Sequence, residues 1–224
     1  MQPLMKATWP MAQRSPQHID GFARHHDRSM PNSLTETYSQ PVSAHKLRTA
    51  ARQLRYGRVI AYPTEAVYGL GCDPTNIDAV QSVLDIKGRP AEKGLILIGA
   101  DFEQLLPYID LEGIRDLPRV LDTWPGPVTW IIKARPDVPA WLRGAHDSVA
   151  VRVTAHPLAA RLAKTFGKPL VSTSANPSGR PPARSALKTR RYFCREKIFI
   201  IPGSLGGELN TTAIFDAQTN ARLR

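Results

Sequence analysis

The stretch Arg58-Val-Ile-Ala-Tyr-Pro-Thr-Glu-Ala-Val-Tyr-Gly-Leu-Gly71 joins an apolar segment to a loop that contains glycine. Residues 58–62 stop at Pro63, which has no N–H to offer a strand ladder, so they predict a strand that ends at the proline. In the loop that follows, Gly69 and Gly71 would let the backbone approach a ligand closely. Taken alone, the same loop is also typical of a tight turn. The stretch therefore predicts a strand that delivers a loop to one end of a sheet.

Helical and strand patterns alternate along the chain around this stretch. Before it, apolar residues repeat at helical spacing between Ser43, which can cap a helix, and Gly57, which can end one. The other expected helices are one capped by Asn76 and those at 101–108, 112–121, 157–167 and 185–193. The other expected strands are 95–98, 128–134, 148–154, 169–173, 198–201 and 213–216. This alternation predicts a single α/β domain with helices packed on a mixed, mostly parallel sheet.

Length and composition fit one ordinary domain with an appendage. The 224 residues are 42% hydrophobic and 22% charged, which excludes global disorder. Residues 1–42 are rich in proline, serine and glutamine and lack an apolar period, so we expect a mostly disordered extension before a domain at 43–224. The chain has two cysteines, Cys72 and Cys194, and lacks an apolar run long enough to span a bilayer. We therefore expect a cytoplasmic protein that does not contact a membrane.

The net charge of +11 favours a polyanionic partner, which could be nucleic acid, a nucleotide or pyrophosphate. A basic surface that only keeps the protein in solution is an equal alternative. No cluster of histidine, cysteine or carboxylate stands at metal-ligand spacing, so we expect no metal held by the protein. There is also no G-x-x-x-x-G-K-[ST] phosphate loop and no G-x-S-x-G elbow.

The loop Ile86-Lys-Gly-Arg-Pro-Ala-Glu-Lys-Gly94 places three cations close together. Lys87 extends the apolar face of its helix, where an unpaired ammonium would be costly, so it requires an anionic partner. Arg89 and Lys93 add two more positive charges, and such a group suits a triphosphate. The alternative is a solvated basic loop at a helix C-terminus, where cations are favoured in any case.

The loop Val171-Ser-Thr-Ser-Ala-Asn-Pro-Ser-Gly179 concentrates small polar side chains at the end of an expected strand. Ser172, Ser174 and Asn176 could hold phosphate oxygens, a ribose or an amino-acid carboxylate. The alternative is a turn in which these side chains bind their own backbone.

Together, these segments resemble the YrdC-like domain family from about Ser43 to the C-terminus. The segments that carry the resemblance are, in chain order, Pro63-Thr-Glu-Ala-Val-Tyr-Gly69, Lys87-Gly-Arg-Pro90, Trp124-Pro-Gly-Pro-Val-Thr129, Ser148-Val-Ala-Val-Arg-Val153 and Ser172-Thr-Ser-Ala-Asn-Pro-Ser-Gly179. The resemblance implies a twisted mixed sheet with a concave, positively charged face.

The resemblance also implies a nucleotidyltransferase reaction. L-threonine, bicarbonate and ATP would give L-threonylcarbamoyladenylate and pyrophosphate, with Mg²⁺ carried by the ATP phosphates. A separate complex would then transfer the threonylcarbamoyl group to adenosine 37 of tRNAs that read ANN codons. An RNA-binding module of the same fold without this turnover is an alternative, with RNA on the basic face, and so is a relative with another small substrate.

The family's functional residues fall on ten positions of this chain. Lys87 and Arg89 would be the catalytic cations. The implied ATP site is Lys87, Arg89, Lys93, Ser148, Ser174, Asn176 and Arg224. The implied threonine site is Thr64, Arg152 and Thr212, with Arg152 on the carboxylate. Since Val151 and Val153 share one strand face, Arg152 should point to the other face, which we expect to line the cleft.

Overall fold

The structure is a computed structural model that describes residues 42–224. The expected extension at 1–42 therefore falls, except for Val42, outside the described residues. No helix among the described residues is long and apolar enough to cross a membrane. Both cysteines are free thiols, with Cys72 buried and Cys194 exposed.

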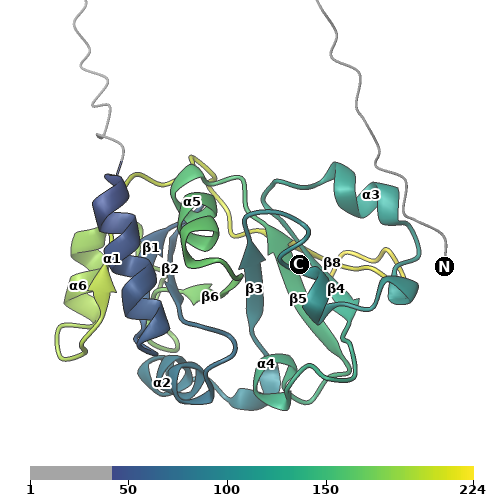
Figure 1. The fold of residues 1–224 in the computed structure, drawn as a ribbon, viewed down its shortest axis with the longest axis horizontal. Helices are drawn as coiled ribbons and strands as arrows, with labels where there is room; N and C mark the ends of the chain where they lie inside the picture. Colours follow the sequence, from purple (N-terminus) through teal and green to yellow (C-terminus); the bar gives the residue numbers. More distant parts are fainter. Residues whose placement is uncertain (1–41) are drawn as a thin grey trace, which may run out of the picture. The chain divides into compact units, whose positions relative to one another are not determined.

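The described strands form one eight-stranded sheet in the order β7-β1-β2-β6-β3-β5-β4-β8 (Figure 1). The strands are β1 (Ile60–Pro63), β2 (Tyr68–Gly71), β3 (Ile96–Gly99), β4 (Val128–Lys133), β5 (Ser148–Val153), β6 (Leu170–Ser174), β7 (Phe199–Ile200) and β8 (Ala213–Asp216). Parallel pairing joins β1 to β7, β3 to β5 and β4 to β8, whereas the other four neighbouring pairs are antiparallel. The mixed sheet is confirmed, but the expectation that it is mostly parallel is wrong.

A tight reversal after β1 explains part of that difference. Both the N–H and the Oγ1 of Thr64 donate to the carbonyl of Val67, at 3.0 and 2.7 Å. The chain therefore turns back at once, and β2 pairs antiparallel with β1. The sequence predicts a loop at 63–71, so the second strand of this hairpin was missed.

The described α-helices follow the local signals closely at their ends. They are α1 (Ala44–Arg55), α2 (Ile77–Lys87), α3 (Leu117–Asp122), α4 (Ala140–Arg143), α5 (Pro157–Phe166) and α6 (Ala186–Tyr192). Ser43 caps α1 by accepting from the N–H of Lys46, and Asn76 caps α2 by accepting from the N–H of Ala79, as expected. His156 does the same for α5, immediately before the expected Pro157.

The helices expected at 101–108 and 112–121 are largely wrong. The region forms turns and two short 3-10 helices, Leu106–Tyr108 and Leu111–Gly113, before α3 begins. Pro107 cannot donate within a helix and Gly113 is a poor helix former, so the apolar spacing there does not extend into longer helices. A further 3-10 helix, Ala91–Lys93, follows α2, and α4 was not predicted.

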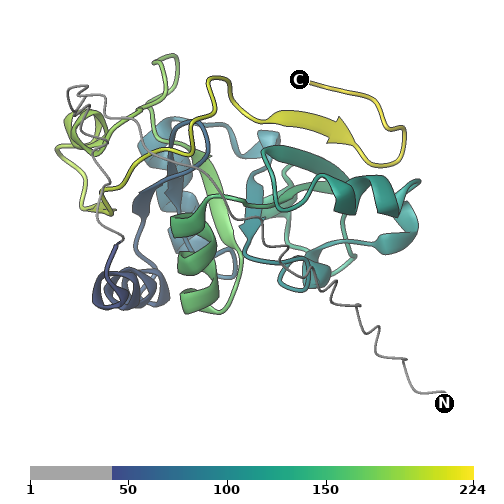
Figure 2. The ribbon, with the colours of Figure 1, turned by 90° about the horizontal axis from the view of Figure 1, so that it is seen from above.

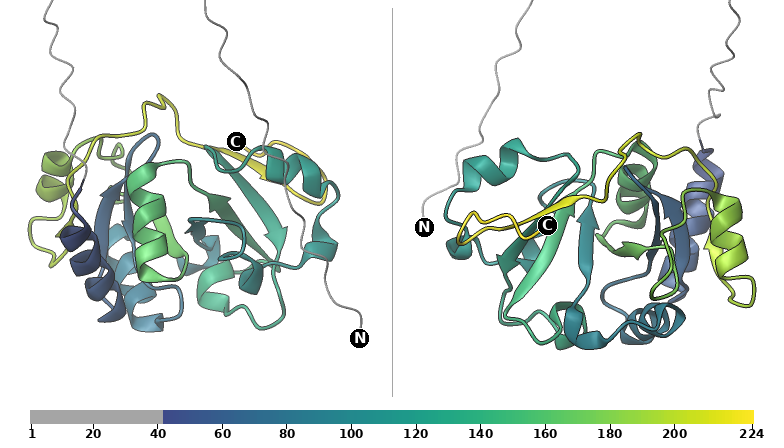
Figure 3. Two further views of the ribbon diagram at one scale, coloured as in Figure 1. Left: turned by 45° about the horizontal axis from the view of Figure 1, so that its top comes forward. Right: turned by 180° about the vertical axis from the view of Figure 1, so that it is seen from behind.

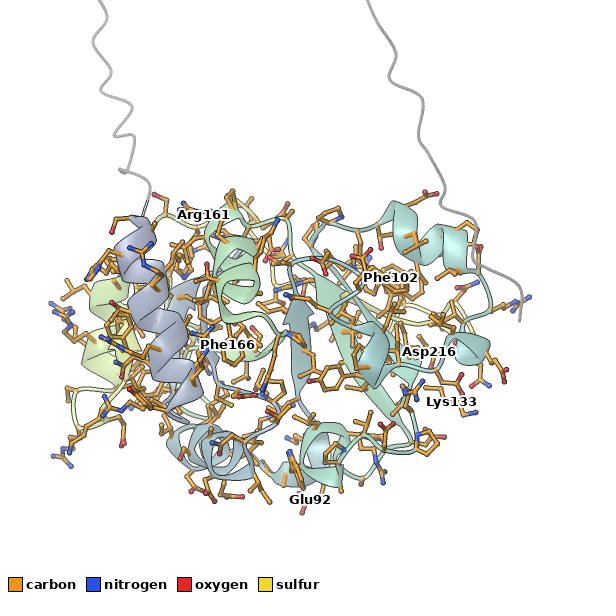
Figure 4. All side chains as sticks on the ribbon, viewed as in Figure 1. Glu92, Phe102, Lys133, Arg161, Phe166 and Asp216 are labelled. Carbon is orange, nitrogen blue, oxygen red and sulfur yellow. The ribbon has the colours of Figure 1, made fainter. Side chains whose placement is uncertain are left out.

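The helices α1 and α5 lie side by side on one side of the sheet (Figures 1 and 2). Arg55 of α1 donates to the carbonyl of Phe166 at 3.2 Å, and its guanidinium carbon lies 5.9 Å from the Phe166 ring centroid. Figure 4 labels Phe166 at the end of α5 that faces α1. The two helices cover a buried apolar cluster that includes Ile60, Tyr62, Ile98 and Leu170.

The strand register shows which residues lie on the same sheet face as the cluster under α1 and α5. Ile98 pairs with Leu170 on one side and with Arg152 on the other. Two positions away along the same strands, Ile96 pairs with Ser172 and Ala150. Because strand side chains alternate between faces, these residues share the face that α1 and α5 cover in part. The uncovered remainder of that face holds the candidate site, where apolar Ile96 and Ala150 lie beside polar Ser172 and Arg152.

Candidate active site

A cavity of about 330 Å³ opens where the ends of several strands and loops meet. Its lining comes from the turn after β1, from β2, β5 and β6, from the loop around the 3-10 helix 91–93, and from the segment that leads into β8. Figure 3 shows two further views of the ribbon in which the course of these segments can be followed. Five of the lining side chains are cationic, namely Arg89, Lys93, Arg143, Arg152 and Arg224, and none of the described lining residues is acidic. Such a cavity suits an anionic ligand.

Eight of the ten sequence-predicted site residues line this one cavity. They are Thr64, Arg89, Lys93, Ser148, Arg152, Ser174, Thr212 and Arg224. These positions span 161 residues of sequence, from 64 to 224, and the sheet brings them together. The other two, Lys87 and Asn176, lie behind the lining, where they contact each other and Ser174.

The ammonium of Lys87 is buried and surrounded by oxygens of one loop. Its Nζ donates to the carbonyl of Ser174 at 2.5 Å and to that of Asn176 at 3.1 Å, with the side-chain oxygens of both residues at 3.4 and 3.3 Å. Burial and the nearby Arg89 lower the pKa of Lys87 to about 8. The lysine therefore ties the end of α2 to the loop after β6, which carries the polar side chains.

Arg89 closes the neighbouring loop. Its Nη2 donates to the carbonyls of Gly94 at 2.9 Å and Lys93 at 3.3 Å, and burial lowers the pKa of the guanidinium. These contacts hold Arg89 and Lys93 together at the cavity wall. Of the three cations expected together, Arg89 and Lys93 thus line the cavity, whereas Lys87 does not.

Arg152 reaches the cavity on the expected face of β5, while Val151 and Val153 lie in the apolar core. Its Nη2 lies 3.2 Å from Oε2 of Glu65, and both side chains are about 5% exposed. The Nε of Arg152 is also buried and has no hydrogen-bond partner in the described structure. The guanidinium therefore has one side chain as a counterion and at least one N–H unused.

The segment after β7 runs along the site and brings Thr212 to it. The N–H of Gly206 donates to the carbonyl of Thr64 at 3.1 Å, and the N–H of Glu208 donates to that of Glu65 at 3.0 Å. At the chain end, Arg224 donates to the carbonyl of Thr212 at 3.1 Å, and burial together with Arg152 lowers its pKa. This places Arg224 and Thr212 on one wall.

Residues 52–223 match the Sua5_yciO_yrdC family, which is described as telomere recombination. The match covers most of the chain and includes all ten predicted site residues except Arg224. The chain belongs to the Sua5/YciO/YrdC family. The YrdC-like resemblance found from the sequence is thereby confirmed.

Curated members of the Sua5/YciO/YrdC family resemble the chain over nearly their whole length. Threonylcarbamoyl-AMP synthase of Methylococcus capsulatus is 55% identical over 183 residues, which are 82% of this chain and 98% of the relative. The protein of the same name from Pseudomonas aeruginosa PAO1 is 50% identical over 185 residues, again 82% of this chain and 98% of the relative.

Solved structures of the Sua5/YciO/YrdC family share the fold. P. abyssi Sua5 complexed with L-threonine superposes with a TM-score of 0.70 at 33% identity, covering 79% of this chain and 52% of that chain. This chain therefore spans about half of the Sua5 chain. E. coli YciO superposes with a TM-score of 0.68 at 25% identity, covering 80% of this chain and 87% of that one.

The two glycines of the first loop have different surroundings in this family member. Gly69 lines the cavity, as expected of a glycine near a ligand. A Cβ on Gly71 would instead lie 2.6 Å from the carbonyl oxygen of Val171 and 2.8 Å from the Tyr62 ring. Gly71 is thus required by packing between strands, and the sequence-based expectation of ligand approach there is wrong.

The lining residues that were not predicted include the polar side chains of Arg143, His146 and Thr211. Arg143 donates to the carbonyl of His146 at 2.6 Å, which ties α4 to the loop before β5. Pro139 directly before α4 and Gly144 after it, at a φ of +68°, could have indicated this short helix.

The side chains of the described site do not form a metal cage. No group of three His, Cys, Asp or Glu able to hold a metal is found among residues 42–224. The carboxylate of Glu65 next to the cavity is already shared by Arg152 and Thr154.

Proposed function

We propose that the chain is an L-threonylcarbamoyladenylate synthase, a nucleotidyltransferase that joins L-threonine, bicarbonate and ATP and releases pyrophosphate. The proposal rests on threonylcarbamoyl-AMP synthases that match the chain over 98% of their own length. Support comes from a cavity with five cations and several hydroxyls, which suits two anionic substrates and an anionic leaving group.

The reaction requires little covalent chemistry from the protein. The threonine amine and bicarbonate form a carbamate and release water, and a carbamate oxygen then attacks the α-phosphorus of ATP. The bond from the α-phosphorus to the bridging oxygen breaks, and pyrophosphate leaves with the electron pair. The protein must hold carbamate and triphosphate in line and stabilise the negative charge that grows on pyrophosphate.

We infer that the triphosphate lies along the loop wall of the cavity. Arg89 and Lys93 supply positive charge from one loop, and Arg89 can grip phosphate oxygens with its planar fork. Ser148, Ser174 and Arg224 contribute hydroxyl and guanidinium donors from three other segments. Lys87 and Asn176 contact each other and Ser174 behind the lining. We therefore infer that they position the loop that carries Ser174 and do not contact ATP directly.

We infer that threonine lies at the other wall. Arg152 supplies a guanidinium for its carboxylate, because this side chain lines the cavity. Thr64 and Thr212 flank the same space from the β1–β2 turn and from the segment before β8. L-threonine is also the ligand named for the P. abyssi Sua5 structure.

Mg²⁺ would enter as part of the nucleotide. With no carboxylate cage among the described residues, its ligands would be the ATP phosphates and water. Bound there, it would neutralise phosphate charge, and the cavity cations would act on the oxygens that it leaves free.

The decisive experiment measures pyrophosphate from the purified chain with ATP and Mg²⁺. We expect pyrophosphate only when both threonine and bicarbonate are present, and a new adenylate in equal amount. Serine in place of threonine is the control for the amino acid. Equal release with serine, or without any amino acid, would overturn the threonine assignment.

The adenylate requires a partner that consumes it. A mixed carbamic–phosphoric anhydride is an activated group donor, so we propose that a separate tRNA threonylcarbamoyl-transfer complex receives it for adenosine 37 of tRNAs reading ANN codons. We place this step in the cytoplasm, where free thiols such as Cys72 and Cys194 stay reduced.

A basic surface on α1 and α5 is a further place for RNA contact. Arg48, Arg52 and Arg55 are exposed along α1, and Arg161, labelled in Figure 4, and Lys164 are exposed on α5. Neither helix contains an acidic residue. The test is a gel mobility shift of tRNA by the protein at several salt concentrations. A salt-dependent shift that is lost in an Arg48→Ala/Arg52→Ala variant would support this contact, and a shift that the variant retains would exclude this surface.

A further inference from the structure

Glu65 is buried beside the cavity but is not part of its lining. It stands in the turn between β1 and β2, with an exposed fraction of 4%. Its Oε1 accepts from the Oγ1 of Thr154 at 2.6 Å and from the N–H of Ala155 at 3.2 Å. Its Oε2 faces Nη2 of Arg152 at 3.2 Å. One carboxylate therefore joins the hairpin turn to the end of β5.

The remaining contacts of Glu65 reach the segment that carries Thr212. Its carbonyl accepts from the N–H of Glu208, and a Cβ on Gly206 would lie only 2.9 Å from its Cα. The same Thr154 hydroxyl that donates to Glu65 accepts from the N–H of His156 at 3.1 Å. The turn, the end of β5 and the segment before β8 thus meet at this residue.

A buried guanidinium needs a counterion that fixes its orientation toward a ligand. Arg152 has five N–H donors in a rigid fork, and its side chain is about 6% exposed. One end of the fork faces Glu65 in an ion pair without hydrogen-bond geometry, since neither Oε2 of Glu65 nor the buried Nε of Arg152 has a hydrogen-bond partner in the described structure. Without a counterion the buried guanidinium would be strongly disfavoured, and without a fixed direction its fork could not match a planar carboxylate.

We propose that Glu65 is a positioning residue for the amino-acid end of the reaction. It orients Arg152 so that the part of the guanidinium that lines the cavity meets the substrate carboxylate. The inference rests on the proposed function, in which Arg152 receives that carboxylate. It goes beyond that function because Glu65 itself touches no substrate and acts only through Arg152.

The test compares Glu65→Gln with the unchanged chain in steady-state pyrophosphate release. Glutamine keeps the shape but loses the charge that fixes Arg152. We expect the KM for threonine to rise by about tenfold or more, the scale of one charge-assisted contact. We expect the KM for ATP to stay within about twofold. Glu65→Asp, which keeps the charge on a shorter side chain, should recover part of the threonine affinity.

Asp73→Asn is the matched control, since Asp73 is also a buried carboxylate and pairs with Lys168 at 3.2 Å away from the cavity lining. It should lower thermal stability and leave the KM for threonine unchanged. If Glu65→Gln does not fold, Thr154→Val removes the hydroxyl that donates to Oε1 without changing charge. That variant should raise the threonine KM by a smaller factor.

The outcomes separate this inference from the proposed function. If the unchanged chain releases no threonine-dependent pyrophosphate, the proposed function fails. If it does, and the folded Glu65 or Thr154 variant has the original threonine KM, the positioning role is wrong while the function stands. An equal rise in both KM values would also overturn the positioning role, because a general structural defect explains it.

Discussion

The Nζ atom of Lys87 lies 2.5 Å from the carbonyl oxygen of Ser174. This contact joins the last residue of α2 to the last residue of β6, 87 positions later. The N–H of Ser178 also donates to the carbonyl of Lys87 at 2.9 Å, so backbone and side chain both hold the same loop. The ammonium therefore acts on the proposed ATP site through the loop that it binds.

Lys87→Met should weaken ATP use while the protein stays folded. Methionine fills similar space but leaves the carbonyls of Ser174 and Asn176 without their donor, so the Ser174 loop loses its fixed position. Losing a contact to a charged group costs about 1.5–3 kcal/mol, so kcat/KM for ATP should fall about tenfold to a hundredfold. Lys164→Met, which changes an exposed lysine of α5, is the control and should keep the original kinetics.

The lowered pKa of Lys87 predicts that the stability of the folded protein depends on pH. Burial and Arg89 lower this pKa from 10.5 to about 8 in the folded protein. Between these values the unfolded chain binds the proton that the folded chain has lost, so this group makes the free energy of unfolding rise with pH. Urea unfolding at several pH values between 7.5 and 10 should show this contribution as a difference between the unchanged chain and Lys87→Met. Parallel pH curves for the two proteins would contradict it.

Gly71→Ala should destabilise the protein, while Gly69→Ala on the same strand should act mainly on the cavity. The new Cβ at 71 would meet the Val171 carbonyl oxygen at 2.6 Å, and backbone cannot move aside cheaply. Overpacking of this kind costs about 1–3 kcal/mol. At 69 the nearest atom is the Ser172 Oγ at 3.3 Å, a side chain that can adjust. Thermal unfolding of the two variants checks the difference, and equal midpoints would refute it.

The features that the sequence predicted are those with a local cause. The caps at Ser43 and Asn76 depend on neighbours three residues away, and the face of Arg152 follows from alternation along one strand. Glu65 was missed because its importance arises from Arg152 and Thr154, about 90 positions later. Spacing along a chain carries no information about such a contact, and the antiparallel hairpin that creates it was itself assigned to a loop.

The same limit explains why Lys87, which was expected to bind ATP, lies behind the cavity lining. Its helical face indicated that the ammonium would be buried and would need an anionic partner. It is buried, but its partners are neutral oxygens of Ser174 and Asn176. The need of a buried ammonium for oxygen partners could not show whether these would be oxygens of a triphosphate or carbonyls of the protein. The packing of α2 against the loop after β6 is what brings the protein carbonyls to Lys87.

Arg152→Lys should raise the threonine requirement more than the ATP requirement. The guanidinium of Arg152 lines the cavity and has enough donors to face Glu65 and still donate to a carboxylate. A lysine ammonium keeps the charge but has one nitrogen, which Glu65 would attract, and it cannot form two parallel bonds. The loss should cost about 1–3 kcal/mol and appear as a higher KM for threonine in steady-state pyrophosphate release. Arg135→Lys, in an exposed pair with Asp137 at 3.4 Å, is the matched control and should change neither KM. A threonine KM equal to that of the unchanged chain, or a defect confined to ATP, would place the amino-acid pocket at another part of the cavity.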